Sequence, residues 1–450
     1  MISLLDKLQT NSVDISRSES VSRDGKVSQV VGLVIEATGP RGAVGSLCKI
    51  QSNNCDQIRA EIVGFRQDKI LLMPLDDTIG ITPGSRVKAS SQPLTIPVGD
   101  NLVGRVLDGL GNPMDGLGPI SGDNHYPVFN LPPDPLKRAR IQTQLTCGIR
   151  GIDGLVPIAN GQRVGIFSGS GVGKSVTLGM VARNTSAEIN VIALVGERGR
   201  EVREFIENDL GEEGMKRSVL VIATSDQAPY IRLKAALVAT TIAEYFRDKG
   251  KNVMLMMDSL TRVAQAQREV GLAVGEAPTA KGYTPSVFAF LPRLLERAGT
   301  NDVGSITGLY SVLVEGDDLS DPVADAARSI LDGHLVLSRD LANKGHYPPL
   351  DVLKSVSRLK NSITSKERLN QINRIIELLA VYRDAEDLIN IGAYSTGNNP
   401  KVDLAVKLIP EINNFLTQDI DESSNLDATF EEVSNIFSHI LKDLNLVATG

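Results

Sequence analysis

The stretch SGSGVGKS combines glycines, a lysine and a serine in a spacing suited to phosphate binding. It fits the pattern G-x-x-x-x-G-K-[ST], except that Ser168 stands where the first glycine is usual. Its glycines can adopt positive φ, so that successive backbone N–H groups curl into a nest for an anion. Lys174 can reach the β- and γ-phosphates, and the Ser175 hydroxyl can bind Mg²⁺. The residues expected to bind ATP here are Ser168, Gly169, Ser170, Gly171, Val172, Gly173, Lys174 and Ser175.

The surroundings of this loop are those that a phosphate site requires. An apolar run, RVGIF, precedes it and predicts a strand, and the pattern VTLGMVARN after it predicts a helix. A helix that begins near Lys174 directs its N-terminus at the phosphates. Ser168 is then at the end of the strand and outside the nest, where a residue with negative φ is acceptable. A purely structural glycine-rich turn is the disfavoured alternative, because the GKS ending and the strand–helix context coincide.

Carboxylates follow two other apolar runs. Asp258 comes directly after VMLMM, and Glu197 follows VIALV. The carboxyl ends of parallel strands meet at one edge of a sheet, so both side chains should lie near Lys174. Asp258 is expected to hold Mg²⁺ through water, and Glu197 could polarise the attacking water.

The segment VGERGREV contains a second carboxylate, Glu201, four residues after Glu197. Glu201 is a weaker candidate for the metal site. The same spacing also suits a charge-balanced surface loop, because the neighbouring basic residues are Arg198, Arg200 and Arg203. The spacing alone leaves these two interpretations open.

The elements around these residues alternate between strands and helices. The apolar runs show no polar alternation, as is typical of strands buried on both faces of a parallel sheet, and helical patterns separate them. After residue 349 the strands stop, and Leu369, Ile372, Ile376 and Leu379 recur at helical spacing. The predicted strands are RVGIF, VIALV, SVLVIA, VMLMM, SITGLYSVL and HLVLS.

Residues 26–93 have a different texture, with short β-rich runs separated by Gly, Pro and Asn. This pattern predicts a small antiparallel barrel, and a two-sheet sandwich is the alternative. Within the first 22 residues, one apolar helical stripe could be formed by Ile2, Leu4, Leu5 and Leu8, but the segment is too short to build a core.

Composition narrows the class of protein. The chain has 450 residues, a net charge of −7, no Trp and 4% aromatic residues. Binding to nucleic acid through the whole surface would favour a basic protein. No apolar run of membrane-spanning length and no secretory signal is evident. We therefore expect a cytoplasmic protein that does not bind nucleic acid.

The motifs SGSGVGKS, VGERGREV, MMDSLTR and YPPLDVLKSVSR occur in this order in the catalytic subunits of rotary ATP synthases, and the chain resembles that family over about residues 25–450. Within the family it is similar to the flagellar ATPases of type III protein export. The injectisome ATPases are the nearest alternative. The family tolerates a small residue at the position of Ser168.

The resemblance implies an α/β fold with a RecA-like P-loop NTPase core, an N-terminal β-barrel and a C-terminal helical domain. The implied boundaries are 1–22 for a segment that docks a regulator, 23–93 for the barrel, 94–349 for the ATPase core and 350–450 for the helical domain.

The resemblance also implies roles for single residues. Glu197 would activate water, and Arg198 and Arg262 would surround the phosphates and the glutamate. Tyr347 would stack on adenine. Arg358 would act as an arginine finger in the neighbouring subunit's site, where a guanidinium in trans stabilises the transferring phosphoryl group.

The partners that the resemblance implies are those of an export apparatus. They are further copies of the chain in a homohexamer, a regulator or stator protein at residues 1–22, and a central stalk protein at the ring pore near the loop 315–322. The resemblance also implies contacts with the export gate, with chaperones and with export substrates, at the inner membrane face.

Two functions of other classes are less favoured. A non-catalytic nucleotide-binding subunit would lack the water-activating Glu197. A ring-shaped RNA translocase should have aromatic residues in its N-terminal domain. Here Phe65 is the only aromatic residue between Lys26 and Pro93.

Overall fold

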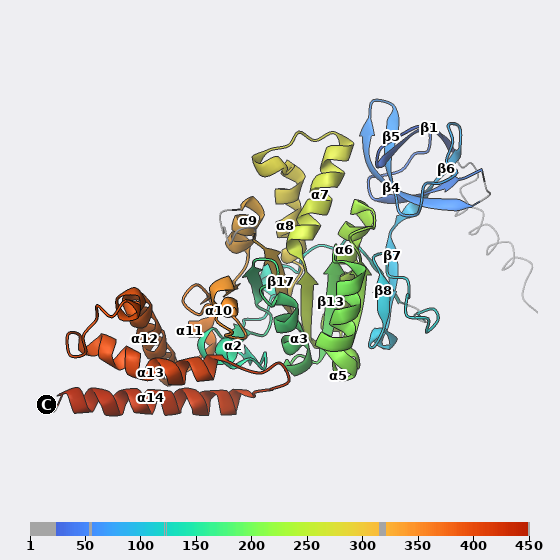
Figure 1. Cartoon of the computed structure of the whole chain (residues 1–450). Coiled ribbons are helices and arrows are strands. Elements are labelled where there is room, and N and C mark those ends of the chain that lie inside the picture. Colours follow the sequence, from blue (N-terminus) through green and yellow to red (C-terminus); the bar gives the residue numbers. More distant parts are fainter. Residues whose placement is uncertain (1–23, 54–55, 121, 123, 315–320, 449–450) are drawn as a thin grey trace, which may run out of the picture. The chain divides into compact units, whose positions relative to one another are not determined.

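The computed structural model describes residues 24–53, 56–120, 122, 124–314 and 321–448 (Figure 1). The described residues form two compact units, one made by those up to Leu94 together with Leu272–Glu276, the other by the remainder. The predicted docking segment 1–22 and most of the loop 315–322 lie outside the described residues. The boundary predicted at 349/350 stays a prediction.

The first unit is a closed antiparallel barrel with the strand order β1-β2-β5-β4-β3-β6, which confirms the barrel and excludes the sandwich. Alternate side chains point inward, and Ile35, Ile50, Ile62 and Leu72 are fully buried. The strands are β1 (Gly25–Val31), β2 (Val34–Thr38), β3 (Ser46–Gln51), β4 (Gln57–Arg66), β5 (Lys69–Pro74) and β6 (Arg86–Pro93).

The second unit is built on a mostly parallel sheet with the order β19-β18-β12-β17-β15-β13-β14-β8, and β16 pairs with β17. All six predicted strands are present in it, within two residues of their expected limits. The strands are β8 (Val106–Asp108), β12 (Arg163–Ser168), β13 (Ile189–Val195), β14 (Ser218–Ala223), β15 (Asn252–Asp258), β16 (Gly299–Thr300), β17 (Ser305–Leu313), β18 (Gly333–Leu337) and β19 (Val356–Ser357).

Helices cover both faces of this sheet. Leu178 and Val181 of α3 share a core with Ile192 of β13 and Leu220 of β14, while α6 packs on β13, β14 and β15. The fold is therefore the predicted α/β P-loop NTPase core. The helices are α2 (Arg150–Leu155), α3 (Lys174–Asn184), α4 (Gly199–Glu204), α5 (Gly211–Met215), α6 (Pro229–Asp248), α7 (Leu260–Val274), α8 (Pro285–Leu295), α9 (Pro322–Ile330), α10 (Arg339–Asn343) and α11 (Lys360–Ile363).

Short elements complete this unit. The π-helical turn η3 joins α4 to α5 and packs against α3. The remaining elements are β7 (Thr95–Val98), η1 (Asp100–Leu102), β9 (Asn124–Pro127), η2 (Pro135–Lys137), β10 (Gln144–Leu145), β11 (Ile158–Ala159), η3 (Phe205–Leu210) and η4 (Ala280–Gly282).

The C-terminal part is helical, as predicted. It consists of α12 (Lys366–Asn390), α13 (Pro400–Leu416) and α14 (Leu426–Ala448), and α13 and α14 pack on α2 (Figure 1). The helix starts follow local chemistry: the Ser365 hydroxyl accepts a hydrogen bond from the Arg368 backbone N–H at α12, and Asn399 with Pro400 begins α13. These helices share one continuous hydrophobic core with the sheet.

The apolar stripe of α12 differs in detail from the prediction. Its most buried residues are Ile372, Ile375 and Leu378, whereas Ile376 and Leu379 are only partly buried. The helix is apolar on a broad face, so spacing alone did not show which residues meet α13 and α14 most closely.

Candidate nucleotide-binding and catalytic site

The loop SGSGVGKS links β12 to α3, at the carboxyl edge of the sheet. Ser168 ends the strand, is buried, and does not have positive φ. Gly171 and Gly173 have φ of +75° and +103°, which non-glycine residues rarely adopt. Gly169 lacks the positive φ that the sequence allowed. The left-handed turns that shape the loop therefore occur at two of its glycines.

The Lys174 ammonium lies between two carboxylates from neighbouring strands. It contacts Asp258 Oδ1, and Glu197 Oε1 lies 3.6 Å away. All three side chains are largely buried, with at most 16% of their surface exposed. The structure thus brings together three residues predicted to meet, which β12, β13 and β15 position at one sheet edge.

Ser311 is a member of this cluster that the sequence reasoning missed. It is fully buried on β17, and its hydroxyl donates to Asp258 Oδ1 at 2.7 Å. The one available signal was a polar residue inside the apolar run SITGLYSVL. The hydrogen bond fixes the direction of the Asp258 carboxylate.

The Glu197 carboxyl has an unusual pKa. The pKa is raised from 4.5 to about 7 overall: burial is the largest cause, Asp258 and a hydrogen bond with Glu201 also raise it, and Lys174 and Arg262 lower it. A carboxylate that titrates close to the working pH is suited to exchange protons with a reacting water.

The basic residues near Glu197 are placed differently. The Arg262 side chain packs beside Gly196, and its guanidinium donates to the Gln265 side chain at 3.3 Å. Arg198 is 77% exposed and lies 3.7 Å from Glu201. Glu201 itself is partly exposed on α4, so it is placed to modulate Glu197 rather than to contact Lys174.

Tyr347 lies beside the phosphate-binding loop. A Cβ added to Gly173 would be 3.7 Å from the Tyr347 ring, which is partly exposed. The Gln418 backbone N–H donates to the Tyr347 carbonyl at 2.9 Å, so that the segment between α13 and α14 holds this residue. An exposed ring next to the loop can stack on a base.

Arg358 lies at the opposite edge of the sheet from the loop. It follows β19, where Ser357 pairs with Gly333 at the start of β18, and Gly333 also pairs with Val164 at the start of β12. Four residues of strand, roughly 13 Å at 3.3 Å per residue, separate that edge from Ser168. The exposed guanidinium donates to the Arg328 carbonyl at 3.2 Å. Arg358 therefore lies well away from its own chain's phosphate loop.

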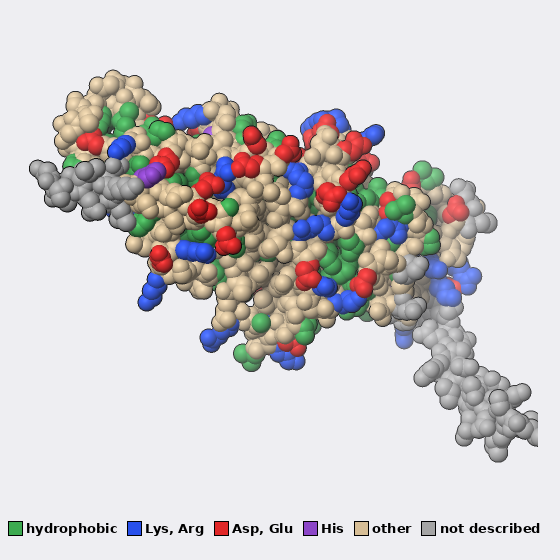
Figure 2. Space-filling view, turned by 90° about the horizontal axis from the view of Figure 1, so that it is seen from below, with side chains coloured by type: hydrophobic (Ala, Val, Ile, Leu, Met, Phe, Trp, Pro, Cys, Tyr) green, Lys and Arg blue, Asp and Glu red, His purple; other side chains and the backbone are tan. Residues whose placement is uncertain are grey.

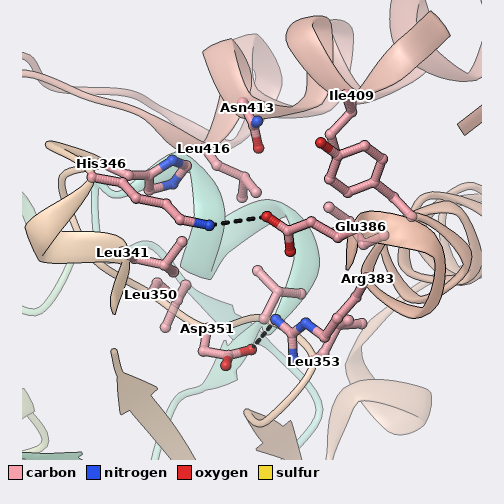
Figure 3. Close-up of a pocket in the computed structure, with 14 residues that line it drawn as sticks. Leu341, His346, Leu350, Asp351, Leu353, Arg383, Glu386, Ile409, Asn413 and Leu416 are labelled. Atoms are coloured by element: carbon pink, nitrogen blue, oxygen red, sulfur yellow. Dashed lines mark hydrogen bonds and ion pairs between the residues drawn. The ribbon is translucent and has the colours of Figure 1, made fainter. Parts of the chain in front are cut away.

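A separate cavity of about 350 Å³ lies between the segment 341–353 and helices α12 and α13 (Figure 3). Two ion pairs cross it, Lys344 to Glu386 at 3.0 Å and Arg383 to Asp351 at 2.8 Å. Its cations are already paired, so it differs from a phosphate site.

Two general features concern the charge of the surface and the apolar character of the helices. On the face shown in Figure 2, acidic and basic side chains are interspersed rather than gathered by sign. Within the described ranges, no helix has the length and apolar character needed to cross a membrane.

Comparison with known proteins identifies the family to which the chain belongs. Residues 148–357 match the nucleotide-binding domain of the ATP synthase alpha/beta family, residues 27–90 match its beta-barrel domain, and residues 364–435 match the T3SS EscN ATPase C-terminal domain. The chain belongs to the ATP synthase alpha/beta family and is a P-loop ATPase.

Curated relatives define the branch of this family. A flagellum-specific ATP synthase of Bacillus subtilis is 53% identical over 94% of this chain and 97% of its own length. A type 3 secretion system ATPase of Xanthomonas euvesicatoria is 49% identical over 92% and 94%. The chain is thus a member of the flagellar and type III secretion ATPases, and resembles the flagellar ones.

Solved structures agree. The assembled ATPase EscN of the enteropathogenic E. coli type III secretion system is 43% identical, with a TM-score of 0.87 over 92% of this chain and 100% of that chain. EscN in complex with its central stalk EscO gives a TM-score of 0.85 at 42% identity, with the same coverage.

Proposed function

We propose that the chain hydrolyses Mg-ATP in a homohexameric ring and couples hydrolysis to the delivery or unfolding of flagellar export substrates. The observation that carries the proposal is the placement of the charged residues. Lys174, Glu197 and Asp258 meet at one edge of the sheet, and Arg358 is exposed at the opposite edge. One protomer therefore holds most of a hydrolytic site and presents the remaining cation to another.

The residues at the loop fit a magnesium ion. Mg²⁺ prefers oxygen ligands, usually one or two carboxylates or hydroxyls with water and phosphate oxygens. Ser175 is exposed in the first turn of α3, and the buried Asp258 carboxylate contacts Lys174, the residue before it. Ser175 would ligate the ion, and Asp258 would hold its water. The ion supplies positive charge that neutralises the phosphate oxygens.

Each residue of the chain has a distinct part in the proposed reaction. Lys174 binds the β- and γ-phosphates, and the N–H groups of the loop and α3 complete the cradle. Glu197 in its ionised form accepts a hydrogen bond from the attacking water and orients it. Arg262 lowers the pKa of Glu197, and the exposed Arg198 would contribute positive charge near the phosphates.

The ring follows from Arg358. A guanidinium supplied in trans to a phosphoryl transition state is worth roughly 10³–10⁵ in rate. Since Arg358 lies at the edge opposite its own loop, it can act only on a neighbour's nucleotide. The solved EscN structure is that of an assembled ATPase, which supports the same arrangement here.

The proposed cellular role rests on the relatives. Flagellum-specific ATP synthases of Bacillus subtilis and Pseudomonas aeruginosa, at 53% and 50% identity, favour flagellar export over an injectisome. A stalk protein at the pore is supported by the EscN–EscO complex. A regulator at residues 1–22, the export gate, chaperones and an inner-membrane location complete the proposal.

Phosphate release from purified protein with Mg-ATP tests the enzymatic part. Lys174→Ala should abolish release, whereas Lys216→Ala, which removes an exposed lysine paired with Glu213, should leave it unchanged. Equal activity of both variants would refute the phosphate assignment. Absence of release from the unmodified chain at every protein concentration would favour a non-catalytic nucleotide-binding subunit. Deletion of the gene should abolish flagellar filaments.

A further inference from the structure

Arg339 joins the phosphate-binding loop to a distant part of the chain. It is the first residue of α10, directly after β18, which lies beside β12 in the sheet. Its Nη2 donates to the backbone carbonyl of Ser170 at 3.1 Å, across 169 residues of sequence. We propose that Arg339 is a positioning residue that holds the phosphate-binding loop in its binding conformation. The inference rests on the proposed function, because it assigns the loop to a nucleotide.

The geometry of one peptide group explains how the contact would act. In a trans peptide, the carbonyl of one residue and the N–H of the next point in opposite directions. When Arg339 holds the Ser170 carbonyl on the outer side of the loop, the Gly171 N–H is directed to the inner side. Gly171 has φ of +75°, the left-handed conformation that makes successive N–H groups converge on an anion.

Packing does little to hold this peptide. Ser170 and Gly171 are exposed, and within the described residues no heavy atom comes within 4 Å of a Cβ built on Gly171. Glycine also gives the 170–171 peptide unusual freedom to rotate. The hydrogen bond from the Arg339 guanidinium therefore has a large share in deciding the orientation of the loop's apex.

The base of the loop is supported only in part. Ser168 and Gly169 line a small cavity of about 90 Å³ together with Ser338 and Arg339. The buried Ser168 hydroxyl oxygen has no hydrogen-bond partner among the described residues. A loop that starts above a void can shift into it, and Arg339, which lines the void and bonds to the apex, opposes that shift.

The attachment of Arg339 makes it a suitable anchor. The Ser338 hydroxyl accepts from the Leu341 N–H and caps α10, and the Ser338 N–H donates to the Pro349 carbonyl at 2.8 Å. The guanidinium is planar and carries donors in a fixed array, so it directs a hydrogen bond more strictly than an ammonium.

Nucleotide affinity provides the first test. Arg339→Ala should weaken binding of a fluorescent ADP analogue about threefold to tenfold, the range expected for one exposed, charge-assisted hydrogen bond. Adenosine, which lacks phosphate, should compete equally well in both proteins. Lys344→Ala is the matched control, because Lys344 is a cation directly after α10 that pairs with Glu386. It should bind ADP like the unmodified chain, and Arg339→Lys should recover part of the affinity.

Hydrogen exchange in the nucleotide-free protein separates loop positioning from direct contact with phosphate. A peptide covering residues 169–176 should exchange faster in Arg339→Ala than in the unmodified chain, while peptides from β12 exchange alike. If Arg339→Ala does not fold, Arg339→Gln serves in the same comparison.

Three results would overturn the proposal: unchanged exchange of the loop, equal weakening of adenosine and ADP, or unchanged ADP affinity. Lys174→Ala distinguishes the two levels of inference. If Lys174→Ala loses ADP binding while Arg339→Ala binds normally, only the role of Arg339 is refuted. If Lys174→Ala also binds normally, the nucleotide site itself is misassigned.

Discussion

The pH dependence of hydrolysis tests the assignment of Glu197 directly. The pKa of its carboxyl is raised from 4.5 to about 7, chiefly by burial, and only the ionised form can take up a proton from the attacking water. About a tenth of the carboxyls are ionised one pH unit below the pKa, and about nine-tenths one unit above it. Hence kcat/KM should rise about tenfold between roughly pH 6 and 8, whereas a carboxylate at its ordinary pKa would give a flat profile.

Neighbouring charges give this prediction two controls of opposite sign. Arg262 lowers the pKa of Glu197, so Arg262→Gln should move the midpoint of the profile to higher pH. The hydrogen bond with Glu201 raises the pKa of Glu197, so Glu201→Gln should move the midpoint to lower pH. Desolvation is the largest contribution, so neither substitution should return the midpoint to the ordinary range of a glutamate.

The assay is steady-state phosphate release with Mg²⁺ in excess, repeated at substrate concentrations that define kcat/KM at each pH. Nucleotide affinity measured over the same pH range shows whether binding contributes to the profile. A flat profile between pH 6 and 8, or midpoints that move in the same direction in both variants, would refute the role of a buried, titrating Glu197.

Three further predictions concern the same cluster and the ring. Glu197→Gln should stop hydrolysis yet stabilise the fold. The pKa of Glu197 is higher in the folded than in the unfolded chain, so above pH 7 the ionised carboxylate lowers the free energy of unfolding by up to about 3 kcal/mol. Denaturant unfolding of the variant should therefore show a gain in stability above pH 7 that vanishes as the pH falls towards 4.5. Ser311→Ala should raise the Mg²⁺ concentration needed for half-maximal turnover, because Asp258 loses its 2.7 Å hydrogen bond; an unchanged requirement would separate Asp258 from the ion. Inactive Arg358→Ala mixed with inactive Lys174→Ala should regain activity, since a mixed interface can pair an intact Arg358 with an intact Lys174; no recovery in verified mixed rings would contradict action in trans.

Local chemistry along the chain was sufficient to predict much of the fold. Apolar runs without alternation identified the buried parallel strands, and glycine spacing with a following lysine identified the loop before α3. Each of these patterns extends over about ten residues, so it can be recognised in the sequence without knowing which distant segments pack against it. The carboxylates Glu197 and Asp258 could be placed near Lys174 because parallel strands end at a common edge.

The order of the strands, by contrast, was decided by tertiary structure. Because β18 lies beside β12, Arg339 reaches Ser170, and because β17 lies beside β15, Ser311 reaches Asp258, each across a long stretch of chain. No local pattern encodes such contacts, since they depend on how distant segments pack.

The raised pKa of Glu197 has the same origin. It reflects desolvation by residues from several strands and helices, which a sequence does not reveal. The sequence determined which residues could do the chemistry. The packing of the sheet decided which of them meet and how far the pKa of Glu197 is raised. It also placed Arg358 at the sheet edge opposite its own phosphate loop. Sequence alone could not decide these points, because burial and strand order arise only when the whole chain has folded.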